Sequence, residues 1–252
     1  MSVTRLHVWS GPRNLSTAMM RSWENRPDTV VVDEPFYAAF LARTGLDHPG
    51  RDDVIASQPT DEAEVRAALE APLPPGRTLH YVKEMTHHLR EDDDLAWTSG
   101  FRNVLLIRDP DEVVASYVRS RESCEPDDTG LLQQERMVAF WDAHDAAPPI
   151  IDAADFLRAP EAYLRWICDW LGVPFTDRML AWPAGPRDTD GVWAPHWYAA
   201  VQASTGFEPW RPRDVHLSAH DAAVAATCRP AYETLHGRRV VLPGSDPVQD
   251  RN

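Results

Sequence analysis

Small and polar residues interrupt an apolar stretch near the start of the chain, before a helix-like pattern begins. The stretch reads VWSGPRNLSTAMMRSWENR over residues 8–26, and its break contains Gly11, Pro12, Arg13, Asn14, Leu15, Ser16 and Thr17. A turn that enters a helix presents unpaired backbone N–H groups and the positive end of the helix dipole. Arg13 would add a charged fork of donors, and Ser16 and Thr17 would add hydroxyl donors. This combination indicates a site for phosphate or sulfate.

A simpler interpretation of the same break stays open. Gly11-Pro12 is an ordinary turn dipeptide, Asn14 is a favourable N-cap, and Arg13 would then be a surface residue. The break is not a Walker A loop, since no GK[ST] sequence occurs and the lysine and the magnesium-binding hydroxyl of that loop are not both present.

A second anion-binding pattern lies in LLIRDPDEVVASYVRSR, residues 105–121. Arg108 follows an apolar strand-like run, and Asp109-Pro110 is a strong helix start. Ser116 lies about two helical turns beyond Asp109, so it projects from the same face. Arg108 and Ser116 could therefore hold one phosphate between them. The alternative is an arginine that pairs with a nearby aspartate and a small serine that packs the helix.

Five strand-like runs alternate with helix-like segments and must position these residues. The runs cover residues 5–9, 29–35, 79–85, 101–107 and 148–153. Such alternation predicts an α/β fold with a central parallel sheet and helices on both faces. The carboxyl ends of parallel strands share one edge of the sheet, where open α/β folds bind ligands. The two anion-binding patterns should meet at that edge.

The pattern indicates one domain over residues 1–252, because no internal repeat and no second core is found. Two long insertions interrupt the alternation. Residues 43–78 are polar and Pro-rich with one helical pattern, whereas residues 175–217 look like a long irregular loop. Long loops in compact α/β domains are often functional lids. A last helix is expected at about 218–236.

Composition excludes several classes of function. A net charge of −14 argues against binding to nucleic acid or to an anionic membrane surface. The chain has no apolar run of eighteen residues and no signal-peptide layout, which favours a cytoplasmic protein. Cys124, Cys168 and Cys228 are far apart and form no CxxC pair, so neither a disulfide framework nor a metal site is expected. The sequence leaves a homodimer open.

The two patterns together resemble the sulfotransferases that use 3′-phosphoadenosine 5′-phosphosulfate (PAPS). The 5′-phosphosulfate loop of that family has the form P-[KR]-S-G-[ST]-[ST], and residues 12–17 read PRNLST, with Asn14-Leu15 in place of Ser-Gly. The family's 3′-phosphate motif has an Arg and a Ser eight residues apart, as Arg108 and Ser116 are. Residues 154–175, ADFLRAPEAYLRWICDWLGVPF, are similar to a third family segment. The resemblance implies a P-loop sulfotransferase-like fold and PAPS as donor, with 3′,5′-adenosine diphosphate (PAP) as product.

The resemblance also implies a catalytic base. The family often has a histidine after the third core strand in a K-x-H-L-like context, and VKEMTHHL places His88 there, with His87 as its neighbour. Glu34, at the end of the second strand, is the rival base, since some bacterial members use a glutamate at that place. Which of the three takes the acceptor's proton is left open, with His88 preferred. Lys83 would help to hold the sulfate.

One loop weakly resembles the family's C-terminal R-K-G-x-x-G-D-W lid, which closes over the 3′-phosphate and adenine. This loop contains the sequence GPRDTDGVWAPHWYAAVQASTGFEPW. Arg187 and Trp193 would then bind the donor. The expected function is transfer of a sulfuryl group to a hydroxyl or amine of a small molecule, without a metal. The alternatives are a P-loop phosphotransferase and a sulfotransferase-like protein that binds a nucleotide without turnover. The acceptor's identity is not indicated.

Overall fold

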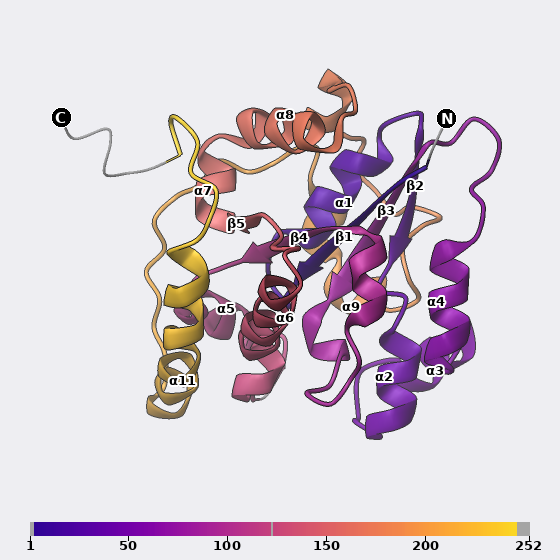
Figure 1. The fold of residues 1–252 in the computed structure, drawn as a ribbon. Coiled ribbons are helices and arrows are strands. Elements are labelled where there is room, and N and C mark those ends of the chain that lie inside the picture. The colour runs from indigo at the N-terminus through magenta and orange to yellow at the C-terminus, as the bar shows by residue number, and fades with distance from the viewer. Residues whose placement is uncertain (1–2, 122, 246–252) are drawn as a thin grey trace.

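All five strand-like runs lie side by side in one parallel sheet (Figure 1). The computed structural model describes residues 3–121 and 123–245. The strands are β1 (Thr4–Ser10), β2 (Thr29–Asp33), β3 (Leu79–Met85), β4 (Arg102–Ile107) and β5 (Ile150–Asp152). Their order is β2-β3-β1-β4-β5, and each neighbouring pair is parallel. The predicted α/β fold with a central parallel sheet is confirmed.

Helices cover both faces of this sheet. The α-helices are α1 (Ser16–Glu24), α2 (Tyr37–Thr44), α3 (Arg51–Ser57), α4 (Glu62–Glu70), α5 (Pro110–Tyr117), α6 (Leu131–Ala143), α7 (Ala153–Arg158), α8 (Pro160–Leu171), α9 (Ala194–Trp197), α10 (Ala199–Ala203) and α11 (Ala219–His236). The 3₁₀ helices are η1 (Thr86–His88), η2 (Ala96–Gly100), η3 (Pro126–Thr129) and η4 (Asp177–Leu180). None of the described helices combines the length and apolar character needed to cross a membrane.

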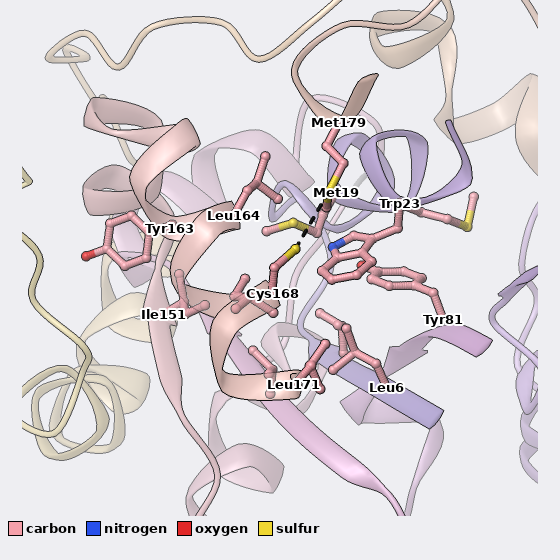
Figure 2. Close-up of a cluster of buried hydrophobic side chains, with 14 of the residues drawn as sticks. Leu6, Met19, Trp23, Tyr81, Ile151, Tyr163, Leu164, Cys168, Leu171 and Met179 are labelled. Atoms are coloured by element: carbon pink, nitrogen blue, oxygen red, sulfur yellow. Dashed lines mark hydrogen bonds between the residues drawn. The ribbon is translucent and has the colours of Figure 1, made fainter. Parts of the chain in front are cut away.

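A large apolar cluster joins one face of the sheet to α1 and α8 (Figure 2). Trp23 of α1 stacks on Tyr81 of β3 with ring centroids 5.7 Å apart. Cys168 of α8 lies 3.9 Å from the sulfur of Met179. A second cluster, around Trp9 and Trp141, packs α6 and α11 against the other face. Buried aromatic rings contribute much of the apolar area in both layers.

The helix start predicted at Asp109-Pro110 is confirmed. The Asp109 side chain accepts a hydrogen bond from the Asp111 N–H, and Pro110 occupies the first turn of α5. Asp61 caps α4 in the same way. At the other end, α8 stops at Gly172, which has a φ of 71°, a value that glycine adopts without strain. The buried, free thiols of Cys124, Cys168 and Cys228 agree with the expected absence of a disulfide framework.

The two insertions contain more helix than the sequence predicts. Residues 43–78 include both α3 and α4. Residues 175–217 were expected to form an irregular loop, which is wrong in part, because η4, α9 and α10 lie within them. The reason is tertiary packing: Trp193 and Tyr198 of this segment are buried in a cluster with Tyr37 of α2. Such contacts over a distance in sequence leave no helical periodicity in a segment this short.

Candidate active site

A cavity of about 690 Å³ opens at the carboxyl edge of the sheet. This volume is in the range of sites for small molecules and cofactors. Its walls come from the segments that follow β1, β2, β3 and β4, together with part of residues 197–213. Ten of the twelve site residues predicted from the sequence line it: Arg13, Asn14, Leu15, Ser16, Thr17, Glu34, His87, His88, Arg108 and Ser116. The fold therefore brings both anion-binding patterns and all three candidate bases to one place.

The loop after β1 is held in a tight, partly strained conformation. Arg13 has a φ of 55°, in the left-handed region that side chains disfavour. Gly11 packs so closely that a Cβ atom there would lie 1.9 Å from the carbonyl oxygen of Thr129. Asn14 donates from its amide to the carbonyl oxygen of Leu106 at 3.0 Å, which ties the loop to β4. Asn14 is thus not the N-cap of α1, a position that Leu15 occupies.

Arg13, Arg108 and Ser116 contact one another directly. The Nε of Arg13 donates to the Ser116 hydroxyl at 3.1 Å, and Arg108 Nη1 donates to the Arg13 carbonyl oxygen at 2.5 Å. Arg108 also forms a salt bridge with Glu112 at 2.6 Å. Burial, together with the positive charges of Arg119 and Arg108, lowers the pKa of Arg13. An anion in the cavity would relieve this crowding of like charge.

Three more arginines line the cavity, and none of them is paired with a carboxylate of a described residue. Arg119, Arg211 and Arg213 form no hydrogen bond or salt bridge with any residue that the structure describes. Sequence reasoning missed Arg211 and Arg213, which lie just beyond the loop that was likened to a lid. The signal available was PWRPRD, residues 209–214, in which two arginines stand close together in an extended, Pro-rich loop.

Histidines and aromatic rings line the other end of the cavity. His88 stacks between Tyr37 and Phe40, with centroid distances of 4.7 and 4.9 Å. Burial is the main cause that lowers the pKa of His88 well below its usual value, that of His87 to about 3 and that of His48 to about 4. These imidazoles are therefore neutral at pH 7, and burial makes each of them a weaker base than a free histidine.

Glu34 lies beside His88 in this end of the cavity. Its Oε2 is 3.9 Å from His88 Nε2, and its Oε1 is 2.5 Å from the ammonium group of Lys83. Burial raises the pKa of Glu34, although the charge of Lys83 acts in the opposite direction. Lys83 also contacts Asp33 at 2.9 Å. The structure thus pairs Lys83 with carboxylates, whereas the sequence suggested that it holds a sulfate.

Arg187 and Trp193 are the two predicted site residues that do not line the cavity. Arg187 donates to the carbonyl oxygen of Pro183 at 3.1 Å. Trp193 is 1% exposed, and its indole N–H donates to the hydroxyl of Tyr198 at 3.1 Å. Their contact with a donor stays a prediction. In this structure other residues of the segment line the cavity: 197, 198, 200, 201, 204, 206–211 and 213.

Among the described residues, one cluster has the composition of a metal site, formed by Asp152, Asp155 and His236. Its carboxylates already have partners. Asp155 forms salt bridges with Arg158 and Arg239, both at 2.7 Å. Asp152 caps α7 with one oxygen and accepts from Tyr232 with the other. Structural contacts with α7, with α11 and with Arg239 therefore account for the two carboxylates.

Comparison with known proteins identifies the family. The sequence model described as "Sulfotransferase domain" matches residues 4–239. Two proteins of Arabidopsis thaliana, branched-chain-amino-acid aminotransferase-like proteins 1 and 2, are 36% and 35% identical over 222 and 236 residues. The matches cover 86% and 91% of this chain but 39% and 41% of those proteins. The chain thus spans about two fifths of the length of these curated relatives.

Solved structures support the same assignment at the level of the fold. The sulfotransferase domain from the curacin biosynthetic pathway has a TM-score of 0.52 at 16% identity, covering 91% of this chain and 98% of that one. A sulfotransferase from Alicyclobacillus acidocaldarius also has a TM-score of 0.52, at 13% identity, covering 95% and 98%. The parallel sheet agrees with the family match over almost the whole chain: the chain belongs to the sulfotransferase domain family.

Proposed function

We propose that this protein transfers a sulfuryl group from PAPS to a hydroxyl or amine of a small molecule. The observation that carries the proposal is the chemistry of the cavity lining, which contains two groups of side chains. Arg13 and Arg108 contact each other and lie near Arg119, and Arg211 and Arg213 add two more cations to the lining. His88 and the carboxylate of Glu34 form the other group. A donor with several anionic groups fits the arginines, and an acceptor that must lose a proton fits the second group.

The arginines of the lining fit PAPS, because Arg119, Arg211 and Arg213 have no ionic partner among the described residues and the loop after β1 leads into the N-terminus of α1. Arg13, Ser16 and Thr17 would hold the phosphosulfate end, while Arg108 and Ser116 would hold the 3′-phosphate. When bound, PAPS supplies the sulfuryl group. Arg13 and the loop N–H groups would stabilise the negative charge that builds on the bridging oxygen of the leaving PAP. Because arginines can supply this charge stabilisation, the scheme requires no metal.

Glu34 and His88 are the candidates for the acceptor's proton, as the sequence predicted. Burial favours the neutral form of each group: it lowers the proton affinity of His88 and raises that of Glu34. We therefore give the role of base to Glu34, with its Oε2 3.9 Å from His88 Nε2. Glu34 would take the proton as the acceptor atom bonds to sulfur and the bond to the bridging oxygen breaks. His88, preferred on the sequence alone, would orient the acceptor.

Calorimetric titration with PAP tests the donor. We expect binding without magnesium and a weaker response to ATP, whereas a preference for ATP that depends on magnesium would favour the phosphotransferase. Turnover of PAPS with a panel of phenols, alcohols and amines then separates an enzyme from a protein that only binds the nucleotide. Arg13→Ala should lower kcat by about 10² or more. Near-normal kcat in that variant would contradict the role given to the loop.

A further inference from the structure

Lys83 has a buried ammonium group whose hydrogen-bonding capacity is already used. The residue is 1% exposed. Its Nζ lies 2.9 Å from Asp33 Oδ1, 2.5 Å from Glu34 Oε1 and 2.6 Å from the Tyr198 hydroxyl. An ammonium group has three N–H donors, and these three oxygens satisfy them all. Lys83 therefore has no donor left for a sulfate.

Asp33 and Tyr198 close a ring of contacts around Lys83. The Tyr198 hydroxyl donates to Asp33 Oδ2 at 2.7 Å, so each oxygen of this aspartate has a partner. Trp193 donates to the same hydroxyl at 3.1 Å. Asp33, Lys83 and Tyr198 are all buried, and in such surroundings an unpaired charge would be costly. The ring is therefore expected to hold its members in one arrangement.

The ring holds one oxygen of Glu34 and leaves the other without a hydrogen bond to any residue that the structure describes. Oε1 contacts Lys83, whereas Oε2 is 3.9 Å from His88 Nε2, too far for a hydrogen bond. The backbone of Glu34 is also constrained, since its φ is 44° and its carbonyl oxygen accepts from Gln58 Nε2 at 3.1 Å. A strained backbone conformation of this kind is kept only where the surrounding contacts hold it in place. Such conformations are common at functional sites.

We infer that Lys83, Asp33 and Tyr198 are positioning residues that anchor Glu34 Oε1 and thereby present Oε2 to the acceptor. The inference rests on the role of base proposed above for Glu34. Tyr198 comes from the insertion 175–217, so this insertion takes part in forming the acceptor end of the site. Lys83 acts on Glu34 and makes no contact with the donor.

Several charged and titratable groups face Glu34. They are Asp33 of β2, Lys83 and Glu84 of β3, His88 of η1, Tyr37 of α2 and Tyr198 between α9 and α10. Burial and Asp33 raise the pKa of Glu34, whereas Lys83 and the hydroxyl of Tyr198 lower it. Loss of either positioning partner should therefore make Glu34 harder to deprotonate, and loss of the cation should have the larger effect.

Infrared difference spectroscopy of the whole protein over a pH titration measures this directly, with Glu34→Gln used to assign the carboxyl band. In Lys83→Met the midpoint of that band should rise by about one to three pH units, the usual effect of a neighbouring opposite charge. In Tyr198→Phe it should rise by less. Tyr232→Phe is the matched control, because its hydroxyl contacts Asp152 at 3.1 Å outside this ring. Its Glu34 midpoint should match that of the wild type.

Unchanged midpoints in folded Lys83→Met and Tyr198→Phe would overturn the inference. If Lys83→Met does not fold, Tyr198→Phe decides, since it removes only a hydroxyl. Affinities for PAPS and PAP provide a second readout. Lys83→Met should change both by less than about threefold, whereas a loss of affinity for PAPS of more than about tenfold with PAP unchanged would mean that Lys83 holds the sulfate. Failure of the wild type to bind PAP would contradict the proposed function and leave the titration result intact.

Discussion

Two residues that line the cavity have strained backbones. Arg13 has a φ of 55° and Glu34 a φ of 44°, values that cost of order 1–3 kcal/mol for a residue with a side chain. In both cases a side chain from another element holds the carbonyl oxygen, Arg108 for Arg13 and Gln58 for Glu34. The strain therefore lies where the proposed function needs a charge presented at a fixed place.

Arg108→Ala and Ser116→Ala test the donor end. We expect each change to raise the KM for PAPS more than it lowers kcat, because a phosphate far from the reacting sulfur is bound alike in the ground and transition states. Initial rates over a range of PAPS concentrations give both constants. Arg102→Ala is a suitable control, since Arg102 begins the same strand and donates to the Trp170 carbonyl oxygen away from the cavity. Lower kcat with unchanged KM would contradict the assignment.

Glu34→Gln and His88→Ala separate the two candidate bases. If Glu34 is the base, Glu34→Gln should lower kcat by roughly 10² to 10⁴, while His88→Ala should have the smaller effect. The acidic limb of the rate profile should lie above the usual range of a glutamate, because burial raises the pKa of Glu34. Activity is lost as the pH falls through that value, since the protonated acid cannot accept a proton. A larger loss of kcat in His88→Ala than in Glu34→Gln would identify His88 as the base. If both of these variants stay active and His87→Ala is inactive, His87 is the base.

At the scale of elements, the insertion 175–217 is joined to the core by a few buried aromatic residues. Trp193 packs with Tyr37, Phe40 and Tyr198 although its segment has little regular structure. α9 and α10 are too short to be stable alone, so their order depends on this packing. The order of the cavity wall around Tyr198 consequently depends on the cluster around Trp193.

Trp193→Ala should lower the free energy of unfolding by about 3–5 kcal/mol, the usual loss for a large aromatic side chain removed from a core. Urea denaturation followed by circular dichroism measures the change. Val192→Ala is the matched control, because Val192 precedes Trp193 and is 47% exposed, so its loss should stay within about 0.5 kcal/mol. A loss below about 1 kcal/mol for Trp193→Ala would show that the segment unfolds separately from the sheet.

At the scale of the whole molecule, a strongly acidic protein presents a basic cavity. The chain has a net charge of −14, yet five arginines line the cavity. This separation of charge fits the proposed binding of a small polyanion by a protein whose overall charge would repel nucleic acid. The cytoplasmic location and the homodimer considered from the sequence stay predictions, as does the absence of nucleic-acid and membrane partners.

Buried neutral histidines should make the molecule sensitive to acid. Burial lowers the pKa of His80 to about 4, whereas an unfolded chain has a histidine pKa near 6.5. Between these values only the unfolded chain binds the proton, so the free energy of unfolding falls as the pH falls, by about 1.4 kcal/mol per pH unit for one such group. Urea unfolding at several pH values should show a flatter dependence for His80→Gln. The exposed His220→Gln should keep the wild-type slope, and equal slopes for the two variants would contradict the account.

Local patterns in the sequence were enough to predict the sheet and to place most of the candidate site residues at one edge of it. Each strand is a short apolar run, and parallel strands place whatever follows them at one edge, so Arg13, Glu34, His88 and Arg108 could be assigned to a common cleft before any contact was known. Asp109-Pro110 placed the start of α5 for the same local reason. These predictions succeeded because they depend on neighbours in the chain.

Only the tertiary structure decided which partners these side chains have. Lys83 meets the hydroxyl of Tyr198, which lies 115 residues away, and no local pattern encodes that contact. No local pattern encodes the position of Arg211 and Arg213 on the cavity wall, or the position of Trp193 away from it. A residue type and its spacing determine what chemistry a side chain offers and where its strand ends. Packing between distant segments determines whether that chemistry is free for a ligand or already used within the protein.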